Sequence, residues 1–165
     1  MFPAHTIDSA PGAHEAMLGV QQKFGGIPPV VARLANAPHL LNTFLASSAA
    51  VEASSLPPIA REVVIMMVAV RNDCEVCIGI HSSALRRLGR EDLTDALMAG
   101  RELTEPELAA VQRFVHRIYE TSGQVGDADL AAFRSGGYSP ENALDIVLAI
   151  GVYTMSTFAN RMVGS

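Results

Sequence analysis

Two cysteines and a histidine lie within one short segment of this sequence, CEVCIGIH at positions 74–81. We expect a helix here, with Asp73 as its N-cap and Cys74 as its first residue. At 100° per residue, Cys77 then lies about 60° and His81 about 20° from Cys74 around the helix axis. Cys77 and His81, four residues apart, are one turn apart and can touch. Two thiols and an imidazole on one helix face predict redox or nucleophilic chemistry.

A dithiol cycle needs an attacking thiolate, a resolving thiol and a base, and this segment offers all three. Unpaired backbone N–H groups at a helix start favour the thiolate of Cys74, whereas Cys77 lies within reach of His81. Cysteines three residues apart at a helix start can form a disulfide with little movement. These considerations leave open which cysteine attacks first.

Glu62 is the fourth candidate site residue, twelve positions before Cys74. The short Asn72–Asp73 turn predicts that its helix runs antiparallel to the cysteine helix. Glu62 then lies about 15 Å back along one axis and His81 about 10 Å along the next, so the two side chains can meet. A carboxylate against an imidazole orients the ring and raises its basicity. An acid in such an apolar helix is also costly to bury unless it is paired.

Each of these residues has a simpler interpretation. Free cysteines are ordinary core residues, a single histidine is often structural, and Glu62 alone suits the first turn of a helix. The main chemical alternative is zinc, but CxxCxxxH offers three ligands where structural zinc needs four. The remaining histidines show no partner spacing: His5, His14, His39 and His116. We therefore expect no metal.

The composition limits the other classes of function. The chain has 165 residues, of which 49% are hydrophobic, and its mean hydropathy of +0.24 indicates buried subunit interfaces. A net charge of −5 with a single lysine, Lys23, argues against nucleic acid as a partner. The longest purely apolar run, 63–70, is too short for a membrane span. Residues 1–20 lack a basic region followed by an apolar one, so we expect a cytoplasmic protein.

The pattern of apolar residues, prolines and glycines predicts an all-α single domain of seven or eight helices. Val63 to Val70 is β-branched enough for a strand, but its length and the preceding Pro57-Pro58 favour a buried central helix. Thr104 to Glu107 and Ser139-Pro140 have the sequences of helix N-caps. We expect residues 1–12 to form a flexible arm and 13–165 the helical domain. The candidate helical segments are 13–24, 28–35, 39–52, 59–72, 74–88, 91–99, 105–121, 127–135 and 141–162.

The order Glu62, eleven residues, Cys74-x-x-Cys77, three residues, His81 resembles the AhpD-like alkylhydroperoxidase branch of the carboxymuconolactone decarboxylase family. The flanking segments are also similar to peroxidase-related members, over roughly residues 15–162: 24–28 (FGGIP), 61–64 (REVV) and 137–160. The resemblance implies an all-helical bundle that assembles as a homotrimer or homohexamer. It implies no haem, flavin or metal.

The resemblance also implies an activity, the reduction of hydroperoxides or of a partner peroxiredoxin through a Cys74–Cys77 disulfide. By position, Cys77 would attack the peroxide and Cys74 would resolve the sulfenic acid, while His81, backed by Glu62, relays the proton. A dithiol or protein reductant would restore the thiols. Val76 stands where the namesake reductase has a histidine.

Two other functions remain open at this stage. One is a small-acid enzyme, like the lactone decarboxylases, in which His81 and Glu62 act as acid and base without the thiols. The other is a non-catalytic oligomer that senses redox state through the two cysteines.

Overall fold

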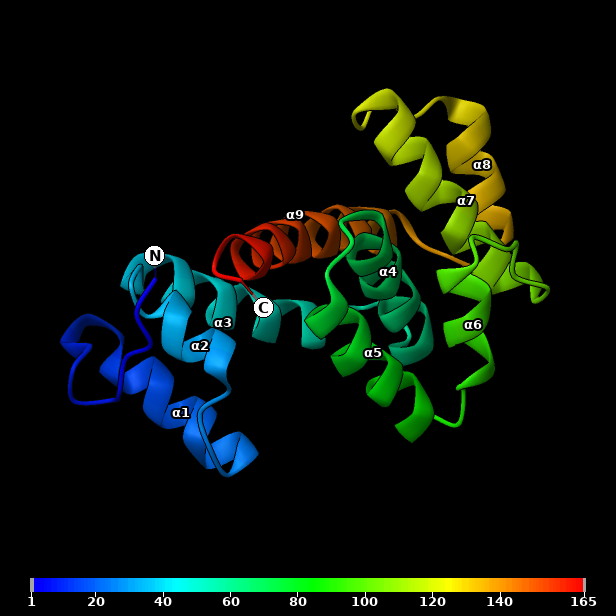
Figure 1. Cartoon of the computed structure of the whole chain (residues 1–165). Helices are drawn as coiled ribbons and strands as arrows, with labels where there is room; N and C mark the ends of the chain where they lie inside the picture. Colours follow the sequence, from blue (N-terminus) through cyan, green and yellow to red (C-terminus); the bar gives the residue numbers. More distant parts are fainter. Residues whose placement is uncertain (1, 165) are drawn as a thin grey trace.

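The computed structural model describes residues 2–164, which form an all-helical bundle with one short 3-10 helix near the N-terminus (Figure 1). Nine α-helices lie in this part of the chain, more than the seven or eight expected, and each corresponds to one of the helical segments named from the sequence. The elements are η1 Pro11–Ala13, α1 His14–Phe24, α2 Pro29–Leu34, α3 Pro38–Glu52, α4 Pro58–Arg71, α5 Glu75–Arg87, α6 Asp92–Met98, α7 Pro106–Thr121, α8 Asp127–Ser135 and α9 Pro140–Met162.

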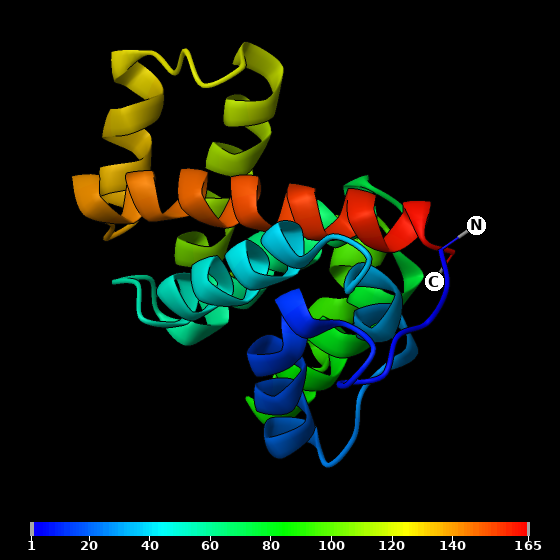
Figure 2. The same cartoon turned by 90° about the vertical axis from the view of Figure 1, so that its left-hand side faces the viewer.

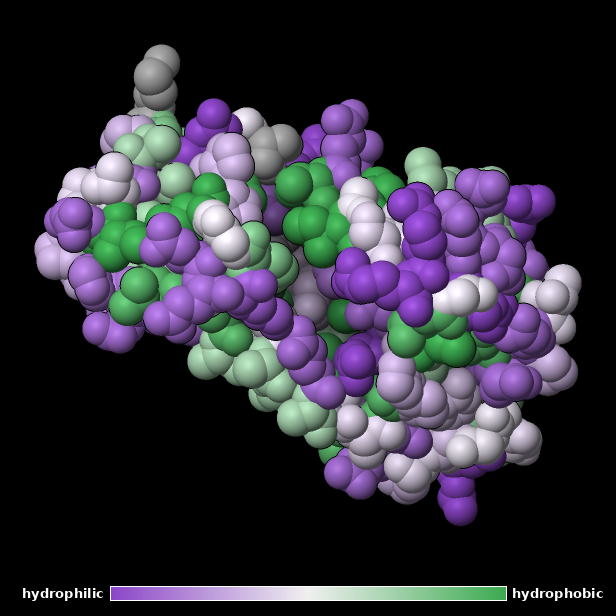
Figure 3. Space-filling model, turned by 90° about the horizontal axis from the view of Figure 1, so that it is seen from below, coloured by the Kyte–Doolittle hydropathy of each residue, from purple (hydrophilic) through white to green (hydrophobic). Residues whose placement is uncertain are grey.

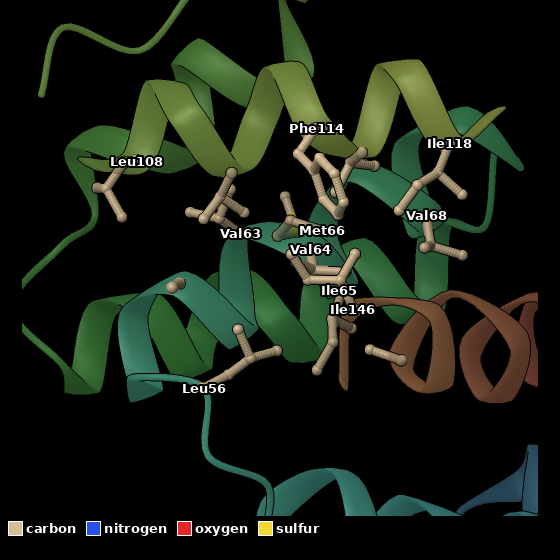
Figure 4. Packing of buried hydrophobic residues seen from close by; sticks show 14 of the residues in the cluster. Leu56, Val63, Val64, Ile65, Met66, Val68, Leu108, Phe114, Ile118 and Ile146 are labelled. Atoms are coloured by element: carbon tan, nitrogen blue, oxygen red, sulfur yellow. The ribbon is translucent and has the colours of Figure 1, made fainter. Parts of the chain in front are cut away.

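The central helix is α4, as its apolar run predicts. It packs against α5, α6, α7 and α9, and its side chains from Val63 to Met66 are almost fully buried. Figure 4 shows Met66 pointing toward Phe114 of α7, and Ile65 lying beside Ile146 of α9. Proline is tolerated in the first turn of α4 because the backbone N–H groups there have no partner within the helix. Burial on all sides stabilises the helical conformation of its β-branched residues.

The first helices form a smaller hydrophobic cluster of their own, around Met17 and Leu41, which the end of α9 also contacts. Residues 2–10 carry no α-helix, although the backbone N–H of His5 donates to the carbonyl of Ala32 in α2. The flexible arm at 1–12 stays a prediction.

The two predicted N-caps differ in outcome. Ser139 caps α9 as expected, because its hydroxyl accepts from the N–H of Asn142 while the Asn142 side chain accepts from the N–H of Ser139. The capping box predicted at Thr104 is wrong. Pro106 is the first residue of α7, so Glu105 becomes the N-cap, and its carboxylate instead receives two hydrogen bonds from Arg90.

The last helix, α9, runs along the molecule and packs across α3 and α4 (Figure 2). By length and composition alone it is also the one helix of residues 2–164 that is long and apolar enough to cross a membrane. However, 44% of its apolar 18-residue stretch is buried inside the fold, so α9 packs here against other helices.

Candidate active site

The turn between α4 and α5 sets the position of the cysteines. Asp73 has a positive φ of 51°, and the N–H of Cys74 bonds back to the carbonyl of Ala69. Cys74 is therefore the N-cap of α5, with an extended backbone, and the helix begins at Glu75. The expectation that Asp73 would be the N-cap and Cys74 the first helical residue is wrong by one position, because the left-handed residue lengthens the turn.

The two sulfur atoms are joined in a disulfide between Cys74 and Cys77, whose Cα atoms are 5.3 Å apart. Cys74 is fully buried and Cys77 is 4% exposed. Ala69 and the half-buried side chains of Val76 and Ile78 pack around them. The predicted proximity of the two cysteines is thus present, in the oxidised form and within an apolar setting.

Glu62 and His81 meet across the antiparallel pair of α4 and α5. The Glu62 Oε2 atom lies 2.8 Å from His81 Nδ1, and both side chains are largely buried, at 12% and 13% exposure. With the proton on Nδ1, the ring donates to the carboxylate and Nε2 is left as the acceptor. His81 follows Cys77 by four residues on α5, a spacing that places the Glu62–His81 pair and the disulfide on the same side of this helix.

Asn160 of α9 is a site residue that the sequence reasoning did not single out. Its Nδ2 donates to the Sγ of Cys77 at 3.2 Å and also lies 3.5 Å from the hydroxyl of Ser156. Asn160 is 6% exposed, so this amide is a buried polar contact to sulfur. The sequence signal for it is only general: a polar residue in an apolar helix needs a partner, but the sequence does not say which one.

Tyr153, also from α9, forms one wall beside His81. Its ring meets the imidazole edge to face, with centroids 5.2 Å apart, and it makes a similar contact with Phe44 of α3 at 6.1 Å. The hydroxyl shares a hydrogen bond of 3.2 Å with Ser48. Burial raises the pKa of Tyr153 above its usual value of 10.0, so the phenol stays neutral at neutral pH.

Two more side chains of α9 fix the turn before Cys74. Thr157 accepts a hydrogen bond of 2.8 Å from the side chain of Asn72. Arg161 donates to the backbone carbonyls of Asn72 and Asp73 and to the Asp73 carboxylate. Side chains of α9 therefore contact the disulfide, the imidazole of His81 and the turn before Cys74. The site thus depends on a segment some 80 residues away in sequence.

The face that carries α1 and α5 is hollowed between these two parts of the molecule, as seen from below in Figure 3. Hydrophobic and hydrophilic side chains both line the rim of this hollow. Two surface pockets lie elsewhere, one between α7 and α8 and the other beside Tyr138 and Arg90, and neither includes a predicted site residue. Among residues 2–164, no three His, Cys, Asp or Glu side chains are grouped to hold a metal ion.

The chain is similar to known proteins in both sequence and fold. The model of the carboxymuconolactone decarboxylase family matches residues 36–113, which include all four predicted site residues. No protein of curated function is significantly similar to the chain in sequence.

Solved structures share the fold over nearly the whole chain. An uncharacterized peroxidase-related protein from Ralstonia eutropha JMP134, described as an alkylhydroperoxidase AhpD core, is 25% identical, with a TM-score of 0.80 over 98% of this chain and 86% of its own. A second peroxidase-related protein, from Silicibacter sp. TM1040, is 25% identical, with a TM-score of 0.72 over 87% of this chain and 78% of its own. A variant of the debrominase Bmp8 in complex with 2,3,4-tribromopyrrole is 15% identical, with a TM-score of 0.78 over 100% of this chain and 90% of its own; at that identity the likeness concerns the fold alone. The resemblance predicted from the sequence is confirmed.

Proposed function

From its similarity to the carboxymuconolactone decarboxylase family model and to the AhpD core structure, we propose that the chain is an AhpD-like member of that family and a thiol-dependent peroxidase or disulfide oxidoreductase. Its substrates are hydroperoxides or the disulfide of a partner peroxiredoxin, and its redox group is the Cys74–Cys77 pair. The single observation that carries the proposal is the contact of this disulfide with a polar cluster in an otherwise apolar core. Asn160 reaches the sulfur of Cys77, and the Glu62–His81 pair lies one turn away.

The first step is attack of the reduced Cys77 on a hydroperoxide. The thiolate forms an S–O bond while the O–O bond breaks, and the departing alkoxide takes a proton to leave as an alcohol. His81 supplies that proton after accepting the one from the thiol, and Glu62 stabilises the imidazolium in between. The peroxide is reduced by two electrons and the sulfur is oxidised to a sulfenic acid.

The second step closes the disulfide. Cys74 attacks the sulfur of the sulfenic acid, the S–S bond forms, and hydroxide leaves and is protonated to water. A dithiol or a reduced protein partner then exchanges with the disulfide, supplying two electrons and two protons and leaving as a disulfide itself. The cycle needs no other cofactor.

Cys77 is the better candidate for the attacking cysteine. It receives the hydrogen bond from Asn160, lies on the same helix face as His81, and is the less deeply buried of the two. A hydrogen bond from a neutral amide favours the thiolate over the thiol. These contacts support the ranking that the family resemblance implies and that spacing alone left open.

The remaining parts of the proposal concern partners and compartment. We expect assembly with other copies of the chain, as a homotrimer or homohexamer by resemblance, and a cytoplasmic location where thiols are kept reduced. Glu62 and His81 act here as a proton relay and not as an independent acid–base pair.

The proposal is tested by following peroxide consumption with a dithiol donor for the wild type, Cys74→Ser and Cys77→Ser. We expect turnover to be lost in Cys77→Ser. Without the donor, reduced Cys74→Ser should consume about one equivalent of peroxide and stop at a sulfenic acid that mass spectrometry detects. Equal rates in all three proteins would end the proposal. Reversible disulfide formation without turnover would indicate a sensor instead.

A further inference from the structure

One helix carries half of the large hydrophobic side chains that this structure leaves exposed. Five of the ten lie on α9: Leu144, Val147, Leu148, Phe158 and Met162. Leu144 and Met162, at its two ends, are 72% and 71% exposed, and Phe158 is 56% exposed. An isolated exposed leucine is ordinary, but a cluster confined to one element marks an interaction surface.

Four of these five, together with Gly151 and Met155, form a stripe along the helix, the α9 outer face: Leu144, Leu148, Gly151, Met155, Phe158 and Met162. Their spacing alternates strictly between four and three residues, the spacing of a coiled-coil seam. At 100° per residue all six, with Val147, fall in an arc about 100° wide, opposite the buried face that holds Tyr153 and Asn160. The helix is therefore apolar on two opposite sides.

Charge is absent from this stripe. The charged residues of α9 are Glu141, Asp145 and Arg161, none of which belongs to the outer face, and Asp145 is hydrogen-bonded to Ser55. A helix that lies on an anionic membrane needs basic residues beside its apolar face. With one arginine near its end and a net charge of −5 for the chain, α9 lacks them. The surface therefore fits another protein surface of the same apolar kind.

The occupant that best matches the stripe is the same stripe on a second copy, running antiparallel. In that register Leu144 faces Met162 of the other copy, Leu148 faces Phe158, and Gly151 faces Met155. The small glycine thus lies opposite a large flexible methionine, whereas a parallel pair would place glycine against glycine and leave a gap. Each partner contributes ~800 Å² to a standard interface, and a stripe of this length, with four large side chains 37–72% exposed, supplies a large part of such an area.

We propose that the α9 outer face is a twofold self-association surface. The contact is isologous, so it is present in a dimer and in a hexamer built with twofold axes, but not in a simple trimer. It places α9, whose side chains contact Cys77, His81 and the α4–α5 turn, at the subunit boundary. The proposal does not depend on the chemistry of the site.

The test is the mass of the full-length protein by sedimentation velocity, for the wild type and two variants. Phe158→Glu places a charge in the stripe at an exposed position. Gly151→Phe adds bulk where a new Cβ meets no atom within 4 Å, so the single chain tolerates it and a close partner does not. The matched controls are Met98→Glu, at an exposed methionine of α6, and Gly19→Phe, at an exposed glycine of α1 with equally open surroundings.

We expect an even-numbered wild-type assembly whose mass falls at least twofold in both stripe variants and is unchanged in both controls. Circular dichroism and titration of free thiols should show the same helix content and the same intact disulfide in all five proteins. A monomeric wild type, an odd-numbered assembly, or an unchanged mass in the stripe variants would overturn the proposal. So would a monomer that binds vesicles of phosphatidylcholine and phosphatidylglycerol through this face and loses that binding in Phe158→Glu.

Discussion

The side-chain amide of Asn160 donates a hydrogen bond of 3.2 Å to the sulfur of Cys77, across 83 residues of sequence. This contact ties the long last helix to the cysteine pair. It distinguishes the two cysteines, because Cys74 is held by the turn and by apolar neighbours, whereas Cys77 meets a polar group.

Asn160→Ala should slow the reaction of reduced Cys77 with peroxide about tenfold at neutral pH, since a hydrogen bond to a charged group contributes about 1.5–3 kcal/mol. Stopped-flow measurement under single-turnover conditions gives the rate directly. The rate should recover at alkaline pH, where the thiolate forms without help. Ser156→Ala is the matched control, because it removes a second hydrogen-bond partner of the Asn160 Nδ2 atom and leaves the contact with sulfur. An Asn160→Ala rate equal to the wild type at every pH would refute the role assigned to the amide.

Glu62→Gln should lower peroxide reduction about 10²-fold while preserving the size of the side chain, since a positioned proton-transfer group contributes roughly 10²–10⁴-fold. The amide cannot stabilise the imidazolium of His81 as a carboxylate does. Steady-state rates with a dithiol donor measure the effect. Glu91→Gln, at a surface pair with Arg86, should leave the rate unchanged. A loss of helix content in Glu62→Gln would assign the effect to folding instead, and circular dichroism checks this.

Asp73→Val should destabilise the protein by about 1–2 kcal/mol, because a β-branched residue is poorly tolerated at a φ of 51°. Asp73→Gly should stay within about 0.5 kcal/mol of the wild type, since glycine suits this backbone and the lost pair with Arg161 is exposed. Urea unfolding measures both. Ser122→Val, at a φ of 52° far from the cysteines, should lose similar stability with normal thiol reactivity. If Asp73→Val and Asp73→Gly were equally stable, the backbone of this turn would not be strained.

All three tyrosines should ionise at a higher pH in the folded protein than in the unfolded chain. Burial raises the pKa of Tyr119, Tyr138 and Tyr153 above 10.0. Their contribution to stability is therefore complete below about pH 10 and is lost as the pH rises through the raised folded values. Titrations followed by tyrosinate absorbance should have a higher midpoint pH in buffer than in denaturant. The free energy of unfolding should fall above pH 10. Tyr153→Phe should make that fall shallower; an unchanged slope would contradict the burial of its phenol.

The sequence predicted the Glu62–His81 contact and the closeness of Cys74 and Cys77 because both follow from local rules. Helical periodicity places Cys77 and His81 together, and a short turn brings Glu62 back to meet them. Asn160 and Tyr153 were missed because their approach depends on how α9 packs across α4, and spacing along the chain carries no information about that. The error of one residue at Cys74 has a similar origin, since a non-glycine residue at positive φ gives no clear signal in sequence. For the α9 outer face, the only indication in the sequence analysis was the high hydrophobic fraction, which predicted a subunit interface without locating it.

The disulfide joins cysteines only three positions apart. A cross-link that encloses so few residues restricts the unfolded chain far less than one that encloses a long loop, so it contributes little to keeping the protein folded. Its two ends are already fixed by the N-cap of α5 and the first turn of that helix. The protein can therefore alternate between its oxidised and reduced states without a large change in its backbone.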